Sequence, residues 1–69
     1  MNKITVIVNG EAKAANKGDS VDDLLRALGL GGVRVALEYN GEFLEQSRAG
    51  ETPLSQGDRL EIVRFVGGG

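Results

Sequence analysis

The sequence contains no cysteine and no histidine. Without cysteine the chain can form no disulfide and use no thiolate, and the lack of both residue types removes the usual ligands of zinc, copper and haem. Catalysis by a Ser-His or Cys-His pair is excluded for the same reason. Any chemistry that this chain carries must come from other groups.

The sequence also lacks a charge excess and a long apolar run. Its 8 basic and 10 acidic residues give a net charge of −2, and the two signs are interspersed. No basic stripe can follow a phosphate backbone, so nucleic acid is not expected as the main partner. No apolar run approaches the roughly 20 residues of a membrane span, and residues 1–5 lack a signal-peptide core. We expect no membrane association and a cytoplasmic location.

With 69 residues, the chain forms at most one small domain. A domain of this size buries only about 60% of the surface that its unfolded chain exposes. The composition, 41% hydrophobic and 26% charged, is ordinary for a globular domain. A second domain or a deep enclosed active site is therefore excluded.

Several segments alternate between apolar and polar residues, which predicts strands. Asn9-Gly10 and Asn40-Gly41 are typical of type I′ hairpin turns, because both turn positions need positive φ. The expected strands are 3–8, a weak edge strand 11–15, 33–39, a short return 42–45, and 59–66. In the last strand Leu60 and Ile62 are expected to point inward. Residues 46–56 are expected to be irregular, with Leu54 as apolar anchor and Pro53 barring a central strand.

One helix is predicted over residues 21–28. Ser20 suits its N-cap, and Asp23 three residues later forms a variant of the capping box. Gly29 suits the position after the helix end. The apolar face that packs on other elements is formed by Val21, Leu24, Leu25 and Leu28.

The order hairpin, helix, hairpin, strand predicts an α+β fold in which the helix packs across one face of a mixed sheet of four to five strands. The last strand is expected in the middle, beside the first. This is the β-grasp, or ubiquitin-like, layout. We expect a β-grasp domain over residues 1–66, followed by a flexible C-terminal glycine tail over residues 67–69.

No conventional catalytic constellation is present. Asp22 and Asp23 are adjacent carboxylates, but neighbours in a helix do not face each other and instead favour the positive end of the helix dipole. Ser20 has no histidine to activate it and already has a role as a cap. The glycine-rich segment 29–32 follows a helix and lacks the lysine of a phosphate-binding loop.

The three terminal residues, Gly67, Gly68 and Gly69, are the most distinctive feature. An ordinary disordered end is one interpretation, since termini are commonly disordered. The other is chemical: glycine has no Cβ, so such an end can enter a narrow channel that excludes side chains. The group presented there is the α-carboxylate of Gly69, which becomes an acyl donor once ATP has adenylated it.

A partner-docking face is predicted beside this tail. Val63 and Phe65 are expected to point outward from the last strand, with Ala36 on the same face. Exposed apolar residues on a small domain can mark a partner surface, although single exposed hydrophobic residues are common. Their position next to the tail favours docking.

The sequence resembles the ThiS sulfur-carrier proteins of thiamin (thiazole) biosynthesis along its whole length. The resemblance rests on ITVIVNGE, SVDDLLRALGL, VALEYNGEFL and above all GDRLEIVRFVGGG. Family members have the β-grasp fold. One departure is Gln46-Ser47-Arg48, where members often have a proline and an arginine.

The resemblance implies a sulfur carrier and not an enzyme. An E1-like adenylating enzyme would convert the Gly69 carboxylate to an acyl-adenylate, using ATP and magnesium that this chain does not itself bind. A sulfur donor such as a cysteine desulfurase would then supply the sulfur of a thiocarboxylate, and thiazole synthase would receive it. Gly67 and Gly68 correspond to the family's glycine end, which enters the partner's active site. A carrier for molybdopterin or another sulfur metabolite, a ubiquitin-like protein modifier and a plain interaction domain remain alternatives.

Overall fold

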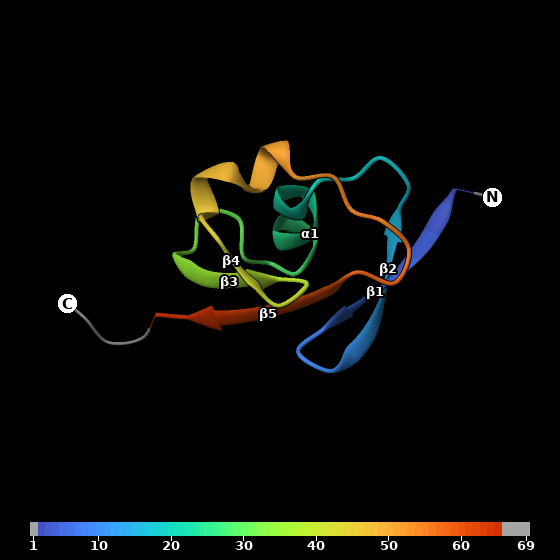
Figure 1. The fold of residues 1–69 in the computed structure, drawn as a ribbon. Coiled ribbons are helices and arrows are strands. Elements are labelled where there is room, and N and C mark those ends of the chain that lie inside the picture. The colour runs from blue at the N-terminus through green and yellow to red at the C-terminus, as the bar shows by residue number, and fades with distance from the viewer. Residues whose placement is uncertain (1, 66–69) are drawn as a thin grey trace.

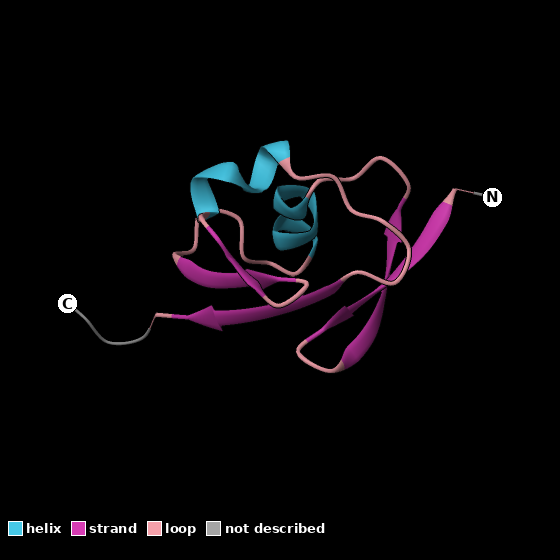
Figure 2. Ribbon diagram, in the orientation of Figure 1, coloured by secondary structure: helices cyan, strands magenta, loops and turns pink. Residues whose placement is uncertain are grey.

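The computed structural model describes residues 2–65, which form a five-stranded mixed sheet with its helices on one face (Figures 1 and 2). The sheet order is β2-β1-β5-β3-β4, as the sequence predicts for a β-grasp fold with the last strand in the middle. The elements are β1 (Lys3–Val8), β2 (Glu11–Asn16), α1 (Val21–Ala27), β3 (Val35–Tyr39), β4 (Glu42–Leu44), the 3₁₀ helix η1 (Gln46–Glu51) and β5 (Arg59–Arg64).

Both predicted hairpins are present, and their turns have the backbone that Asn-Gly favours. Asn9 and Gly10 have φ of 51° and 85°, and Asn40 and Gly41 have φ of 51° and 88°. Positive φ at both positions is what a type I′ turn needs. The first hairpin joins β1 to the edge strand β2, and the second joins β3 to the edge strand β4.

The two turn asparagines also hold the central strand β5. The side-chain amide of Asn9 accepts from the backbone N–H of Ile62 at 2.7 Å and donates to its carbonyl at 3.1 Å. The side-chain oxygen of Asn40 accepts from the backbone N–H of Arg59 at 2.9 Å. Since β5 is also paired with β1 in parallel and with β3 in antiparallel fashion, it is held along both edges.

Helix α1 begins with the predicted capping box. The hydroxyl of Ser20 accepts from the backbone N–H of Asp23 at 3.1 Å, and the Asp23 carboxylate accepts from the N–H of Ser20 at 2.9 Å. These reciprocal bonds satisfy backbone donors that a helix start leaves unpaired. Gly29, with φ of 80°, follows the helix end. The helix spans residues 21–27 with Leu28 as its C-cap, one residue shorter than predicted.

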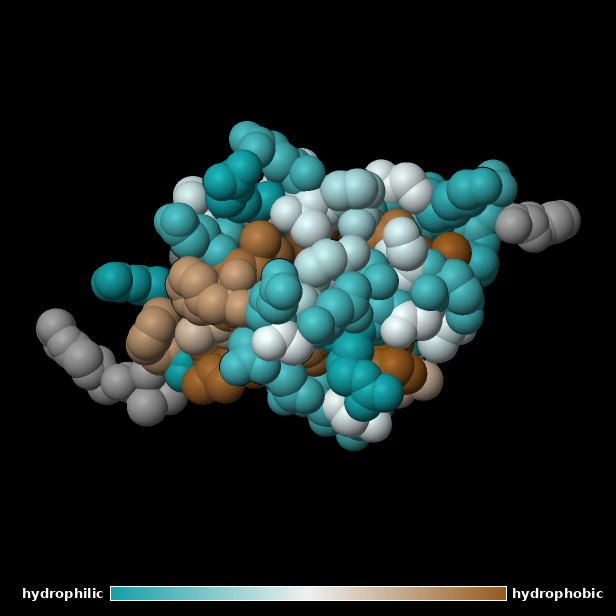
Figure 3. All heavy atoms as spheres, in the orientation of Figure 1, coloured by the Kyte–Doolittle hydropathy of each residue, from teal (hydrophilic) through white to brown (hydrophobic). Residues whose placement is uncertain are grey.

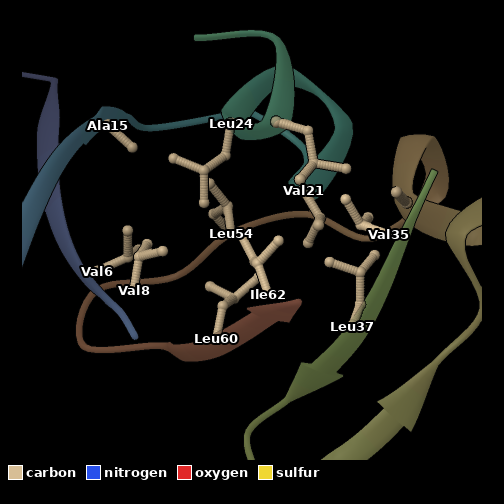
Figure 4. Packing of buried hydrophobic residues seen from close by; sticks show 12 residues of the cluster. Val6, Val8, Ala15, Val21, Leu24, Val35, Leu37, Leu54, Leu60 and Ile62 are labelled. Atoms are coloured by element: carbon tan, nitrogen blue, oxygen red, sulfur yellow. The ribbon is translucent and has the colours of Figure 1, made fainter. Parts of the chain in front are cut away.

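The core lies between α1 and the inner face of the sheet (Figure 4). The largest side chains that are completely buried come from the helix and three central strands: Val6, Val21, Leu25, Leu37 and Leu60. Leu60 and Ile62 point inward from β5, and Leu54 is buried as the anchor of its segment, both as predicted. This core fixes which face of β5 points outward.

Two sequence predictions require correction. The third strand begins at Val35 and not at residue 33, because the Gln46 side chain takes the place of a neighbouring strand there. Its amide donates to the Val33 carbonyl at 2.7 Å and its oxygen accepts from the Val35 N–H at 3.0 Å. The supposedly irregular segment after β4 contains η1, which packs the fully buried Ala49 against the core.

Other boundaries differ by one or two residues from those predicted. Strand β2 extends to Asn16, β4 ends at Leu44, and the hydrogen-bonded part of β5 ends at Arg64. The expected end of the last strand at residue 66, and the expected flexible tail over residues 67–69, lie outside the described residues. Within residues 2–65, no helix is long and apolar enough to cross a membrane.

Candidate functional site

The predicted docking residues lie together on the sheet face that the helices do not cover. Ala36 on β3 is the direct cross-strand partner of Val63 on β5. Val63 is 62% exposed and Phe65, just beyond the strand, is 61% exposed. Gly67, Gly68 and Gly69, the residues predicted to carry the chemistry, lie outside the described residues. The site described here is therefore the surface that precedes them.

Phe43 belongs to the same face, and the sequence analysis missed it. It is 74% exposed, the most exposed large hydrophobic side chain within residues 2–65. The hairpin register pairs it with Glu38, which alternation places on the outer face. A two-residue turn at Asn40-Gly41 fixes this register, so the signal was available in the sequence. We call Ala36, Phe43, Val63 and Phe65 the sheet-face patch.

A shallow hollow of about 130 Å³ lies within the sheet-face patch. The residues that line it are Ala36, Leu37, Glu38, Phe43, Glu61 and Val63. Its walls are mostly apolar, with two carboxylates beside them. In Figure 3, apolar surface gathers at the end of the molecule where β5 ends and β3 begins.

Phe65 is held in place although it lies past the last strand residue. Its backbone N–H donates to the Arg34 carbonyl at 3.3 Å, which continues the pairing of β5 with the segment before β3. The Arg34 guanidinium lies 5.4 Å from the centre of the Phe65 ring. This is within the range of a cation–π contact, worth about 0.5–1 kcal/mol at an exposed site. The direction in which the chain leaves the sheet is thus set up to residue 65.

At its other end, β5 is fixed by a cluster around Asp58. This carboxylate is only 8% exposed and accepts from the Tyr39 hydroxyl at 2.6 Å, the Ser55 N–H at 2.7 Å and the Asn40 amide at 3.2 Å. Burial alone would raise the pKa of Asp58, but the three donated hydrogen bonds outweigh it and lower that pKa. The same contact with Asp58, with burial, raises the pKa of Tyr39 to about 12. Because the Tyr39 proton stays on the phenol, we assign the cluster a structural role: its hydrogen bonds hold the start of β5 in place.

A larger hollow, of about 260 Å³, lies on the helix side of the sheet. It is lined by Val8, Asn9, Glu11, Lys13, Leu28, Leu30, Ile62 and Arg64. None of the predicted site residues line it, and its Lys13 lies 3.6 Å from Glu11 in an ion pair. We therefore do not assign the function to this hollow, although it is larger than the one on the sheet face.

The residues that the sequence analysis rejected as catalytic residues have structural roles. Ser20 and Asp23 form the capping box, and Arg26 lies 3.5 Å from Asp22 and 2.7 Å from Asp23. In the described part of the chain, no group of three potential metal ligands lies together. The sheet-face patch can present apolar side chains, with carboxylates beside them, to another protein.

Comparison with known proteins agrees with this description. The model of the ThiS family matches residues 6–69. The crystal structure of the thiamine biosynthesis protein ThiS from Geobacter metallireducens superposes with a TM-score of 0.78 at 33% identity, covering 96% of this chain and all of that one. The uncharacterized protein ycf40 of Pyropia yezoensis is 36% identical over 66 residues, which is 96% of this chain and 93% of that protein.

A further relative is longer. A thiazole synthase of Paramagnetospirillum magneticum is 38% identical over 64 residues, which is 93% of this chain but 20% of that protein. The chain thus spans about a fifth of the length of this relative. A domain of this kind therefore occurs within a polypeptide named for thiazole synthesis.

The sheet order and the helix packed across one face of a mixed five-stranded sheet define a β-grasp domain of the ubiquitin-like class. The match over residues 6–69 and the solved relative define the family within that class. The chain belongs to the ThiS family, the small sulfur-carrier proteins of thiamin biosynthesis.

Proposed function

We propose that this chain carries sulfur for thiazole formation as a thiocarboxylate on Gly69. The observation that carries the proposal is family membership over residues 6–69, which include the three terminal glycines. In this role the chain is a cosubstrate in the cytoplasm and not an enzyme. It binds no cofactor of its own.

The proposed chemistry has two steps. A Gly69 carboxylate oxygen attacks the α-phosphorus of ATP on an E1-like adenylating enzyme, and pyrophosphate leaves with its magnesium. Sulfide, released by a thiol reductant from the persulfide of a donor such as a cysteine desulfurase, then attacks the acyl carbon; the C–S bond forms as the bond to AMP breaks, which leaves the thiocarboxylate. The first step forms a bond between the carboxylate oxygen and the α-phosphorus and breaks the bond to pyrophosphate. The second forms a carbon–sulfur bond and breaks the bond to AMP. The carrier supplies only the carboxylate.

The structure supports delivery of the tail in two ways. Strand β5 is paired with β3 up to Arg64, and its other edge is held by β1 and the Asn9 side chain up to Ile62, so the chain leaves the sheet at a defined place. The sheet-face patch lies directly beside that exit and offers apolar area for docking. Gly67 and Gly68 would then pass through a channel too narrow for side chains.

Thiazole synthase is the proposed acceptor of the sulfur. Its support is the longer relative, in which a domain similar to this chain is part of a thiazole synthase. A domain joined covalently to an enzyme is present at high effective concentration beside it. A separate carrier needs a docking surface for the same purpose, and the sheet-face patch is the candidate.

The test is the intact mass of the chain after incubation with the adenylating enzyme, ATP, magnesium and a sulfur source. The expected product has one oxygen replaced by sulfur, which fragmentation locates on Gly69. A chain extended by one residue beyond Gly69 is the matched control and should stay unmodified. If adenylation of the chain occurs but no sulfur is incorporated, the chain is a protein modifier or a carrier of another kind.

A further inference from the structure

The shallow hollow in the sheet-face patch is flanked by a pair of like charges placed directly opposite each other. Glu38 on β3 and Glu61 on β5 are cross-strand partners, and both line the shallow hollow. Alternation puts both side chains on the uncovered face, beside Val63 and Phe43. Like charges directly opposite on neighbouring strands destabilise a sheet. The fold therefore bears an arrangement that its own stability does not favour.

The charges of this pair are not balanced within the described part of the chain. None of the ion pairs formed among residues 2–65 includes Glu38 or Glu61. Arg59, two residues before Glu61 on the same face of β5, makes no ion pair with either. Arg34 lies over the Phe65 ring instead.

The surroundings of the two carboxylates fit an arginine side chain. Ala36, Val63 and Phe43 provide apolar walls against which an aliphatic stem can lie, and the exposed Phe43 ring can stack with a guanidinium. Two carboxylates at the side of the same hollow can then accept its N–H groups. A lysine would satisfy the charge but not the stacking.

We infer that the hollow between Glu38, Glu61 and Phe43 receives an arginine side chain from the enzyme that adenylates the tail. This inference rests on the function proposed above, and it concerns one partner. Unpaired carboxylates on the docking face match the charge of an arginine on the enzyme surface that covers this face while the tail is delivered. Such complementarity speeds association and rejects partners with the wrong charge.

The test is ATP–pyrophosphate exchange by the adenylating enzyme at varied concentrations of the chain. In the double variant Glu38→Gln/Glu61→Gln, we expect the KM for the chain to rise about tenfold, the effect of one lost charge-assisted contact, with kcat unchanged. Raising the salt concentration should increase the KM of the unchanged chain but hardly that of the variant. The double variant Glu42→Gln/Glu51→Gln has the same net charge and alters exposed carboxylates outside the hollow. It should behave like the unchanged chain.

Thermal unfolding supplies a second readout, in which the same variant should be more stable although it binds more weakly. Relief of the repulsion should raise the Tm of Glu38→Gln/Glu61→Gln by about 1–5 °C, so weaker binding cannot be attributed to a damaged fold. A KM equal to that of the control double variant would overturn the inference while leaving the carrier function intact. If the unchanged chain supports no exchange at all, the carrier function and this inference both fail.

Discussion

Phe43 offers the sharpest test of the sheet-face patch, because it is exposed and contributes little to the core. Its side chain is 74% exposed. Complete burial of a phenylalanine side chain is worth about 1.5–3 kcal/mol. If docking buries the exposed three quarters, truncation to alanine should cost about 1–2 kcal/mol of binding free energy, which is about 5- to 30-fold in affinity.

The assay is pyrophosphate exchange with the adenylating enzyme. For Phe43→Ala we expect KM to rise by this factor, kcat to stay the same, and the free energy of unfolding to fall by less than about 1 kcal/mol, since only the buried quarter of the side chain is lost. Leu30→Ala is the control, because Leu30 lines the helix-side hollow and not the patch. It should leave KM unchanged. A Phe43→Ala chain with unchanged KM, or a Leu30→Ala chain with an equally raised one, would refute the assignment of docking to this face.

Three further predictions concern the tail, the Asp58 cluster and the helix cap. Gly68→Trp should abolish adenylation because a bulky side chain blocks a narrow channel; normal pyrophosphate exchange by this variant would contradict the channel, and unchanged Tm is the control. Because the pKa of Asp58 is lowered in the folded state, its contribution to stability is full above its unfolded pKa and is lost as the pH falls below about 4. Asp58→Asn should therefore flatten the acid limb of a plot of unfolding free energy against pH, and an unchanged limb would show that other carboxylates dominate. Ser20→Ala should cost about 1 kcal/mol in urea unfolding, and a loss below a few tenths would mean that the capping box contributes little.

The sequence predicted the parts of the fold that depend on local backbone chemistry. Asn-Gly at two places tolerates the positive φ that a type I′ turn needs, and both hairpins are present; Ser20 with Asp23 forms the predicted helix start. Inward and outward positions in β5 followed from alternation. These features depend on near neighbours, which a sequence displays directly.

The errors came from contacts between distant residues. The Gln46 side chain bonds the backbone of Val33 and Val35, and β3 begins only at Val35. No local sequence pattern predicts such a long-range hydrogen bond. Helix η1 is short, has Ala49 as its buried residue, and shows no helical apolar period that a sequence would reveal. At the candidate site, Ala36, Val63 and Phe65 were identified from alternation, while Phe43 was missed because the hairpin register was not carried through to β4. The prediction for Gly67, Gly68 and Gly69 as the reactive end remains a prediction.

Because strand β5 is held in the sheet, the domain also limits how far the end of the chain can reach. Its direction is fixed up to Phe65, whose N–H is bonded to Arg34, and four residues separate that point from the Gly69 carboxylate. Four residues span at most about 14 Å when fully extended. In the proposed function, a partner that docks on the sheet face therefore places its reacting atoms within that distance of Phe65. Lengthening or shortening this segment by one residue should move the carboxylate out of reach or out of line without altering the domain.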